Sequence, residues 1–162
     1  MNKHTIAILV GNRSGVLARV AALFSRRGYN IDSLAVCTTE DPEVSRMTIT
    51  VEADDQILEQ ILKQLNKLID IIKVSDITED DQVDRELALI KVSATPKNRP
   101  EILQIVDIFR GHIVDINPKS LIVEVTGDQG KAEAIVQMLR PYGIIELVRT
   151  GKIAMVRGRL EN

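Results

Sequence analysis

The order of hydrophobic patterns along the chain is the feature that most restricts its fold. An apolar, β-branched run at residues 5–10 enters a loop with two glycines, and a helical stripe that begins at Val16 leaves it. Residues 31–38 and 47–51 then carry alternating apolar positions on either side of a polar turn. The pattern therefore predicts a strand, a helix and a β-hairpin, in that order.

A second helix and a further strand complete the first half. Apolar residues recur at helical spacing from Ile57 to Leu68, and a β-rich run follows at residues 69–74. Asp54 and Asp55 precede this helix and are predicted to cap it. The full order β-α-β-β-α-β is that of the ferredoxin-like split unit, in which two helices cover one face of a four-stranded antiparallel sheet.

The same order returns in the second half, so we predict an α+β protein of two tandem ferredoxin-like (βαββαβ) domains. The acidic, polar stretch at residues 79–83 has no aliphatic pattern and is interpreted as a linker. We therefore place the first domain at residues 1–78 and the second domain at residues 84–162. In the second domain Pro100 suits the start of a helix, and Gly111 is predicted to end that helix.

The second domain is predicted to close with strands at residues 144–148 and 153–156. Asp128 precedes the helix before them and is placed to cap it. The halves also share residues, because Asn12-Arg13 and Asn98-Arg99 stand at matching places. The spacing at the ends of the helices differs, which indicates a shared architecture rather than a clean repeat.

Composition argues against several classes of protein. A net charge of -2 gives no basic field for nucleic acid or an anionic membrane. Aromatic residues make up only 2% of the chain, which leaves almost no platforms for stacking bases. Cys37 is the only cysteine, so we expect no disulfide framework and no cysteine-based metal cluster. No stretch resembles a membrane span or a signal-peptide core, so we predict a cytoplasmic protein.

No constellation of residues predicts catalysis. The loop at residues 11–15 has the wrong spacing for a P-loop and lacks its lysine, and no G-x-S-x-G elbow occurs. His4 and His112 have no adjacent acid–base partner and are interpreted as structural or exposed. The pairs Asp54-Asp55 and Asp80-Asp81 are interpreted as a helix cap and part of the linker, because no third metal ligand accompanies them. We therefore expect no catalytic and no metal-binding residue in this chain.

The loop from Gly11 to Gly15 is the strongest candidate for a binding site. Two glycines permit positive φ and close approach of a backbone, and Asn12 and Ser14 are candidates to cap the helix that follows. Free N–H groups at a helix start attract a carboxylate or a phosphate. The alternative is that Gly, Asn and Ser simply make the turn.

A free amino acid needs N–H donors for its carboxylate, oxygen acceptors for its ammonium group and a matched pocket for its side chain. The loop supplies backbone donors, and the amides of Asn12 and Asn30 can both donate and accept. Val16, Leu17 and Ile31 offer aliphatic walls, which suit a branched aliphatic amino acid. The two ends of the first helix lie roughly 18 Å apart at the usual rise, too far for one small ligand. Two copies about a twofold axis can close both ends on it.

Longer stretches carry a resemblance to a known family. They are Asn12 to Leu17 after an aliphatic strand, Leu23 to Ile31, Ser45 to Thr48, Glu86 to Val92, Ile108 to Gly111 and Arg149 to Gly151. Together they resemble the small, regulatory subunit of acetolactate (acetohydroxyacid) synthase over nearly the whole chain. The first stretch alone would indicate only an ACT domain, the small-molecule-sensing form of the ferredoxin-like fold.

This resemblance implies a non-catalytic partner of a thiamine-diphosphate enzyme in branched-chain amino acid biosynthesis. The catalytic large subunit would condense two pyruvates, or pyruvate with 2-oxobutyrate. Thiamine diphosphate, Mg and FAD would belong to that subunit, and no cofactor to this chain. The small subunit would activate the enzyme and confer feedback inhibition, usually by valine, with leucine or isoleucine as other candidate effectors.

The resemblance also implies a homodimer in which the effector sits between the ACT domains of two subunits. The implied effector-binding residues are Asn12, Gly15, Val16 and Leu17 of one subunit, with Asn30 and Ile31 of the other. Pro100 stands where a sensing loop would have its second glycine, so no equivalent site is expected in the second domain. The alternative is a free-standing ACT-type amino-acid sensor that acts on another enzyme or a transcription factor.

Overall fold

The structure is a computed structural model that describes residues 1–158. The chain forms two compact units. Among the described residues, unit 1 contains residues 1–83 together with residues 152–158, and unit 2 contains Asp84–Gly151. The segment from Lys152 to Gly158 packs with unit 1. The stretch interpreted as a linker contains a turn at Asp80 and the beginning of the next strand at Gln82.

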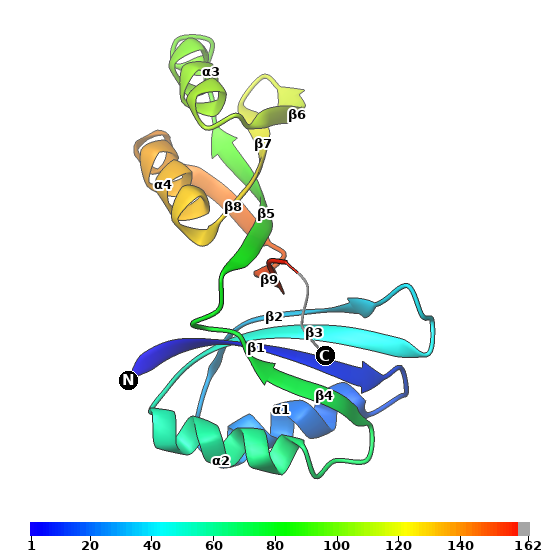
Figure 1. Cartoon of the computed structure of the whole chain (residues 1–162). Helices are drawn as coiled ribbons and strands as arrows, with labels where there is room; N and C mark the ends of the chain where they lie inside the picture. Colours follow the sequence, from blue (N-terminus) through cyan, green and yellow to red (C-terminus); the bar gives the residue numbers. More distant parts are fainter. Residues whose placement is uncertain (159–162) are drawn as a thin grey trace. The chain divides into compact units, whose positions relative to one another are not determined.

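Unit 1 has the predicted order of elements. They are β1 (Asn2–Gly11), α1 (Val16–Arg26), β2 (Ile31–Thr38), β3 (Val44–Ala53), α2 (Asp55–Leu65) and β4 (Ile71–Asp76). The strands form a four-stranded sheet in the order β2-β3-β1-β4, and every neighbouring pair is antiparallel. Both helices lie on one face of this sheet (Figure 1).

Unit 2 repeats that arrangement. Its elements are β5 (Gln82–Ser93), α3 (Arg99–Ile108), β6 (His112–Asn117), β7 (Ser120–Gly127), α4 (Gln129–Leu139), a 3-10 turn (Arg140–Tyr142) and β8 (Ile144–Arg149). The order β6-β7-β5-β8 matches that of the first sheet element for element. The prediction of two ferredoxin-like βαββαβ units in an α+β protein is therefore confirmed.

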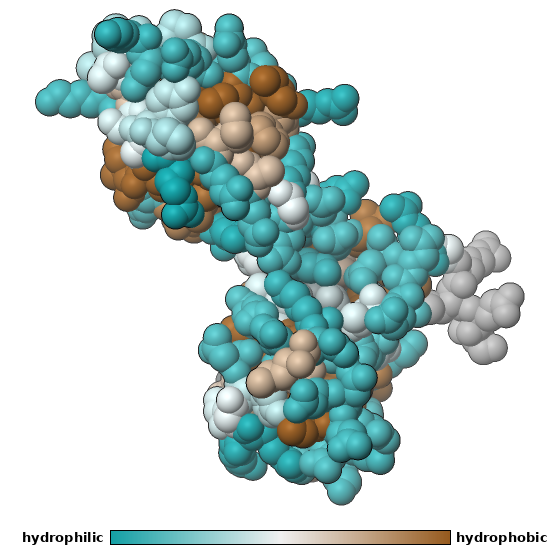
Figure 2. Space-filling model, turned by 90° about the vertical axis from the view of Figure 1, so that its left-hand side faces the viewer, coloured by the Kyte–Doolittle hydropathy of each residue, from teal (hydrophilic) through white to brown (hydrophobic). Residues whose placement is uncertain are grey.

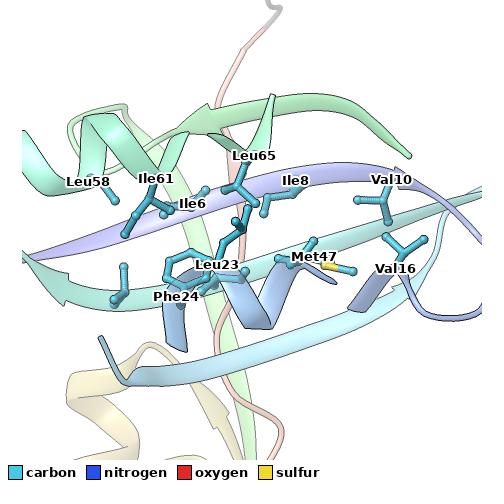
Figure 3. Close-up of a cluster of buried hydrophobic side chains, with 13 residues drawn as sticks. Ile6, Ile8, Val10, Val16, Leu23, Phe24, Met47, Leu58, Ile61 and Leu65 are labelled. Carbon is cyan, nitrogen blue, oxygen red and sulfur yellow. The ribbon is translucent and has the colours of Figure 1, made fainter. Parts of the chain in front are cut away.

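The core of unit 1 forms where the alternating positions of the central strands meet the inner stripes of the two helices. Ile6, Ile8 and Met47 of the sheet and Phe24 and Ile61 of the helices are at most 1% exposed. Figure 3 shows these side chains converging between the sheet and the helices. Burial of an aliphatic or aromatic side chain of this size stabilises the fold by about 1.5–3 kcal/mol. Unit 2 has an equivalent core, which includes Ile90, Ile102, Leu121, Ile135 and Leu139.

The C-terminal strand β9 (Ile153–Val156) pairs with β5, and its segment packs on unit 1. Lys152 Nζ donates to Thr5 Oγ1 at 3.0 Å. Arg46 Nη2 donates to the carbonyl oxygen of Ala154 at 2.7 Å. The segment lies on the side of the first sheet that α1 and α2 leave open (Figure 1). The sequence pattern predicts that a strand forms at residues 153–156, but it says nothing about the face that the strand covers.

The starts of the helices follow the predictions in part. Asp128 caps α4 as predicted, because its Oδ1 accepts a hydrogen bond from Lys131 N at 2.9 Å. Asp54 stands at the N-cap of α2, but its side chain accepts no hydrogen bond from that helix. Asp54 therefore stands at the predicted N-cap position, but its carboxylate does not cap α2.

The ends of α1 and α3 differ from each other. Gly28 follows α1 with a φ of 73°, the left-handed conformation that a helix C-terminus favours. After α3 it is Arg110, with a φ of 55°, that takes this conformation. Gly111 therefore does not end α3 through positive φ. A Cβ at Gly111 would lie only 3.1 Å from the carbonyl oxygen of Glu124, so glycine is needed there for close packing.

The outer surface of unit 2 is apolar at both edges of its sheet. The exposed large apolar side chains on the edge strands β6 and β8 are Val114, Ile116, Ile145, Leu147 and Val148. Figure 2 shows separate apolar areas, in brown, among the hydrophilic surface in teal. Edge strands of this kind leave main-chain groups unpaired beside apolar side chains.

Candidate functional site

The predicted binding loop joins β1 to α1 and is exposed over residues 12–15. Gly15 stands at the N-cap of α1 with φ 84° and ψ -10°, a left-handed conformation that suits glycine. No side chain caps this helix, so the prediction that Asn12 or Ser14 does so is wrong. The physical reason is that the left-handed residue, and not a polar side chain, turns the chain into the helix.

This geometry leaves a row of N–H groups open at the start of α1. Within the described residues, the backbone N–H groups of Ser14, Gly15, Leu17 and Ala18 have no hydrogen-bond acceptor. The partial positive charge of a helix N-terminus adds to these donors. Together they form an arrangement that favours a carboxylate or a phosphate.

Contacts on two sides hold the loop in place. The backbone N of Asn12 donates to the carbonyl of Glu43 at 2.8 Å, and Asn12 Nδ2 donates to the carbonyl of Pro42 at 3.0 Å. On the other side Gly11 N donates to the carbonyl of Asp70 at 2.8 Å. The side-chain oxygen of Asn12 has no donor in the described part of the chain, so it can accept from an ammonium group.

Two arginines and one carboxylate flank the loop. The side chain of Asp70 is 13% exposed, pairs with Arg19, and lies 3.9 Å from Arg13 between Oδ1 and Nη1. A Cβ at Gly15 would lie 3.2 Å from Arg19 Nη1. The guanidinium of Arg19 therefore reaches over the left-handed residue at the helix start. Arg13, Arg19 and Asp70 together carry one excess positive charge.

The apolar residues predicted at this end differ in exposure. Val16 is 3% exposed, and its side chain belongs to the core cluster that contains Val10 and Met47 (Figure 3). Its side chain is therefore not a wall for a ligand within one chain, and only its backbone adjoins the open N–H groups. Leu17 is 43% exposed and stands beside those groups.

Asn30 and Ile31 lie at the opposite end of α1. This helix has 11 residues, so its ends are about 16 Å apart at the usual rise. Asn30 is exposed, and Ile31 is half-buried at the beginning of the edge strand β2. One chain therefore does not bring these two residues to Asn12 and Gly15.

The equivalent loop of unit 2 is closed by its own side chains. Thr95 N donates to Asn98 Oδ1 at 2.7 Å, and Asn98 N donates to Thr95 Oγ1 at 3.3 Å. Arg99 Nη2 donates to the carbonyl of Asn117 at 2.8 Å. Pro100 removes one N–H group from the first turn. Contacts within the chain and the proline therefore leave fewer N–H groups open at the start of α3 than at the start of α1.

Tyr142 adds a further contact to the first turn of α3. Its Oη donates to Glu101 Oε2 at 2.9 Å. This hydrogen bond raises the pKa of Tyr142 above its usual 10.0, and desolvation and the charge of Glu101 act in the same direction. Each of these effects favours the neutral phenol.

Arg19 and Asp70 are site residues that the sequence analysis missed. They stand 51 positions apart, so no local pattern joins them. One signal was available, because an arginine near the start of a helix opposes the helix dipole and needs a compensating partner. In this structure the partner is Asp70.

His4 lies at the other end of β1, away from the loop. Its side chain is 9% exposed, with Nε2 3.2 Å from Asp55 Oδ1 and Nδ1 3.6 Å from Asp76 Oδ2. The sequence suggested no acid–base partner because both carboxylates are distant along the chain. Among the described residues no group of His, Cys, Asp and Glu could hold a metal ion. No helix in this part of the chain is long and apolar enough to cross a membrane.

Both units match known protein families. Residues 6–73 match the family described as the AHAS small subunit-like ACT domain, and residues 85–158 match the small subunit of acetolactate synthase. The chain is 61% identical to a probable acetolactate synthase small subunit of Archaeoglobus fulgidus over 156 residues, which cover 96% of this chain and 98% of that protein. It is 52% identical to the acetolactate synthase small subunit of Mycobacterium bovis over 155 residues, 96% of this chain and 92% of that protein.

A solved structure extends this similarity to three dimensions. The acetolactate synthase small subunit of Thermotoga maritima matches with a TM-score of 0.89 and 42% sequence identity. The match covers 99% of this chain and 100% of that one.

Proposed function

The chain belongs to the family of acetolactate synthase small subunits, which are regulatory and non-catalytic, and from this premise we propose that it senses valine and relays the signal to a catalytic large subunit. Leucine and isoleucine are the other candidate effectors. The observation that carries this proposal is the open row of N–H groups at the start of α1. The match of residues 85–158 to the small-subunit family argues against a free-standing ACT sensor.

The carboxylate of the amino acid binds at the open helix start. Its ammonium group is placed near the side-chain oxygen of Asn12, which lacks a donor in the described residues. Leu17 is exposed beside these groups and provides apolar contact for the aliphatic side chain. Such a division between polar and apolar contacts is typical of small-molecule sites.

A second copy of the chain completes the site. Asn30 and Ile31 are too far from Gly15 to reach the same ligand within one chain. In a homodimer with a twofold axis, the loop of one subunit meets the far end of α1 of the other. This arrangement provides Asn30 as a further polar contact and Ile31 as an apolar one.

Regulation follows from coupling between this interface and the large subunit. Valine favours one of two arrangements of the dimer, and the large subunit responds to that preference with a coupling free energy of about 1–3 kcal/mol. The large subunit carries thiamine diphosphate, Mg and FAD and performs the condensation of two pyruvates or of pyruvate with 2-oxobutyrate. The small subunit activates it and makes it sensitive to valine in the cytoplasm.

Calorimetric titration of the full chain with valine, with leucine and isoleucine as competitors, tests this proposal. We expect saturable binding of valine that Asn30→Ala abolishes. Asn66→Ala changes an exposed asparagine of the same unit whose amide donates to the Leu62 carbonyl and which is not part of the proposed site, and this variant should bind as the unchanged chain does. Absence of binding to all three amino acids, both for the chain alone and for its complex with the large subunit, would contradict the proposal.

A further inference from the structure

We infer that Arg19 provides a second contact for the carboxylate of the effector and that Asp70 positions it. This inference rests on the proposed function and deepens it, since it identifies the recognised group as a free carboxylate. The open N–H groups at the start of α1 would bind an amide oxygen as well as a carboxylate, although less tightly. A guanidinium adds charge and therefore discriminates between the two.

The geometry of Arg19 supports a contact to a ligand at this place. One nitrogen, Nη2, donates to Asp70 Oδ2. The other, Nη1, has no acceptor within the described residues and lies 3.2 Å from the position of a Cβ at Gly15. Guanidinium donors point in fixed directions, so one edge can stay on Asp70 while Nη1 faces the helix start.

Asp70 is suited to hold this arginine because it is itself fixed. Its side chain is only 13% exposed, and its carbonyl oxygen accepts a hydrogen bond from Gly11 N at 2.8 Å. The same residue therefore fastens the start of the loop through its backbone and Arg19 through its carboxylate. Without this partner, a cation at a helix N-terminus would be repelled by the helix dipole.

Charge supports the same assignment. Arg13 and Arg19 share the one carboxylate of Asp70, so these three side chains keep one excess positive charge until an anion binds. The carboxylate of an amino acid supplies that anion. A bound amide would leave the charge in place.

The test compares binding of valine and of valinamide, which has no carboxylate, by calorimetry on the full chain. Arg19→Gln should weaken valine binding about tenfold, a change typical of a lost charge-assisted contact. It should leave valinamide binding nearly unchanged, so that the preference for valine shrinks. Arg140→Gln removes an exposed arginine of unit 2 and should change neither affinity.

Asp70→Asn tests the positioning role. It keeps the carbonyl that holds Gly11 and removes only the charge, and we expect a loss of valine affinity of a few-fold. In the Arg19→Gln background the same change should have no further effect, because residues that act through each other are not additive. Arg19→Lys keeps the charge without the fork geometry and should fall between the unchanged chain and Arg19→Gln.

The possible failures are distinguishable. If the unchanged chain binds valine but Arg19→Gln keeps the same affinity and the same preference over valinamide, the inference is wrong while the proposed function stands. Equal losses for valine and valinamide would also overturn it, since a structural role would affect both ligands alike. If the unchanged chain and its complex with the large subunit bind no amino acid, the proposed function fails and the inference fails with it.

Discussion

The loops that lead into α1 and α3 occupy the same place in two copies of one fold, yet they differ in what they leave free. In unit 1 a left-handed Gly15 turns the chain, and the N–H groups of Ser14, Gly15, Leu17 and Ala18 have no acceptor in the described residues. In unit 2 the side chains of Thr95 and Asn98 bond to each other's backbone, and Arg99 binds a carbonyl. The start of α3 therefore leaves fewer N–H groups open to a ligand than the start of α1 does.

The other ends of the two helices extend this comparison. Gly28 N donates to the Ser25 carbonyl at 3.0 Å, and Arg110 N donates to the Asp107 carbonyl at 3.0 Å. Arg110, and not Gly111, is therefore the counterpart of Gly28. This correspondence accounts for the different spacing that the sequence shows at the two helix ends.

Counting from these left-handed residues, His112 of unit 2 stands where unit 1 has Asn30. Both parts of the proposed effector site are therefore changed in unit 2, the open helix start and the asparagine after the helix. The comparison teaches that the fold alone does not create a sensor. In the proposed site, recognition depends on which backbone donors the loop leaves unpaired.

The largest effect is expected from closing the open helix start. Gly15→Asp places a side chain on a left-handed residue, brings a Cβ 3.2 Å from Arg19 Nη1, and directs a carboxylate to the groups that a ligand needs. We expect valine affinity to fall at least a hundredfold, which is about 2.7 kcal/mol. Calorimetry measures the affinity. In an activity assay with the large subunit, the variant should still activate the enzyme but no longer make it sensitive to inhibition by valine.

Two further variants separate the causes of that loss. Gly15→Ala brings the strain of a left-handed alanine, about 1–2 kcal/mol, without the carboxylate, so its loss of affinity should be smaller. Asn98→Asp places the same carboxylate at the start of α3 and should leave valine binding unchanged. Full valine sensitivity of Gly15→Asp would show that the effector binds elsewhere.

Two asparagine variants, one in each unit, should separate an effect on stability from an effect on valine binding. Asn98→Ala removes the hydrogen bond that Asn98 Oδ1 accepts from Thr95 N and should lower the free energy of unfolding by about 1 kcal/mol without affecting valine binding. Asn12→Ala should abolish valine binding. It should lower the free energy of unfolding by only a few tenths of a kcal/mol, because the hydrogen bond from the Asn12 amide to the Pro42 carbonyl is exposed. Urea unfolding and calorimetry on both variants measure the two effects. A loss of binding in Asn98→Ala would contradict the view that unit 2 has no site.

A smaller effect is expected at the left-handed residues that follow α1 and α3, where substitutions should change the free energy of unfolding in opposite directions. Gly28→Ala forces a side chain into the left-handed conformation and should destabilise the chain by about 1 kcal/mol. Arg110→Gly relieves the same strain, partly offset by the greater freedom of glycine in the unfolded chain, and should stabilise it by about 0.5 kcal/mol. The urea midpoint of each variant measures these changes. If both variants were destabilised, Arg110 would not be the counterpart of Gly28.

Much of the fold could be predicted from the sequence because each element has a strong local pattern. The strand β9 matches its predicted range of residues 153–156, and α4 begins directly after Asp128 as predicted. The left-handed Arg110 could not be predicted, because arginine gives no local signal for positive φ. The position of β9 on unit 1 depends on contacts with Thr5 and Arg46, which are far away along the chain.

The candidate site could be predicted only in part. The two glycines marked the loop, the amides of Asn12 and Asn30 offered polar contacts, and the resemblance to a family placed both asparagines in the effector site. The sequence could not show that Val16 points into the core, because a helix stripe does not say which of its first residues is buried. Nor could the sequence predict that Arg19 pairs with Asp70, because the packing of α2 and the pairing of β4 in the sheet bring these two residues together.

The smallest effect concerns the hydrogen bond between Tyr142 and Glu101, a residue of the first turn of α3. The hydrogen bond from Tyr142 to Glu101 favours the neutral phenol, so the pKa of Tyr142 lies above its usual 10.0. The contribution of this bond to stability is therefore present below that pH and is lost as the pH rises through the raised pKa. In a Tyr29→Phe background, tyrosinate absorbance reports Tyr142 alone, and Glu101→Gln should bring its titration back toward 10.0. An unchanged titration would mean that Glu101 does not hold the phenol in solution, and that the first turn of α3 depends on Thr95, Asn98 and Arg99 alone.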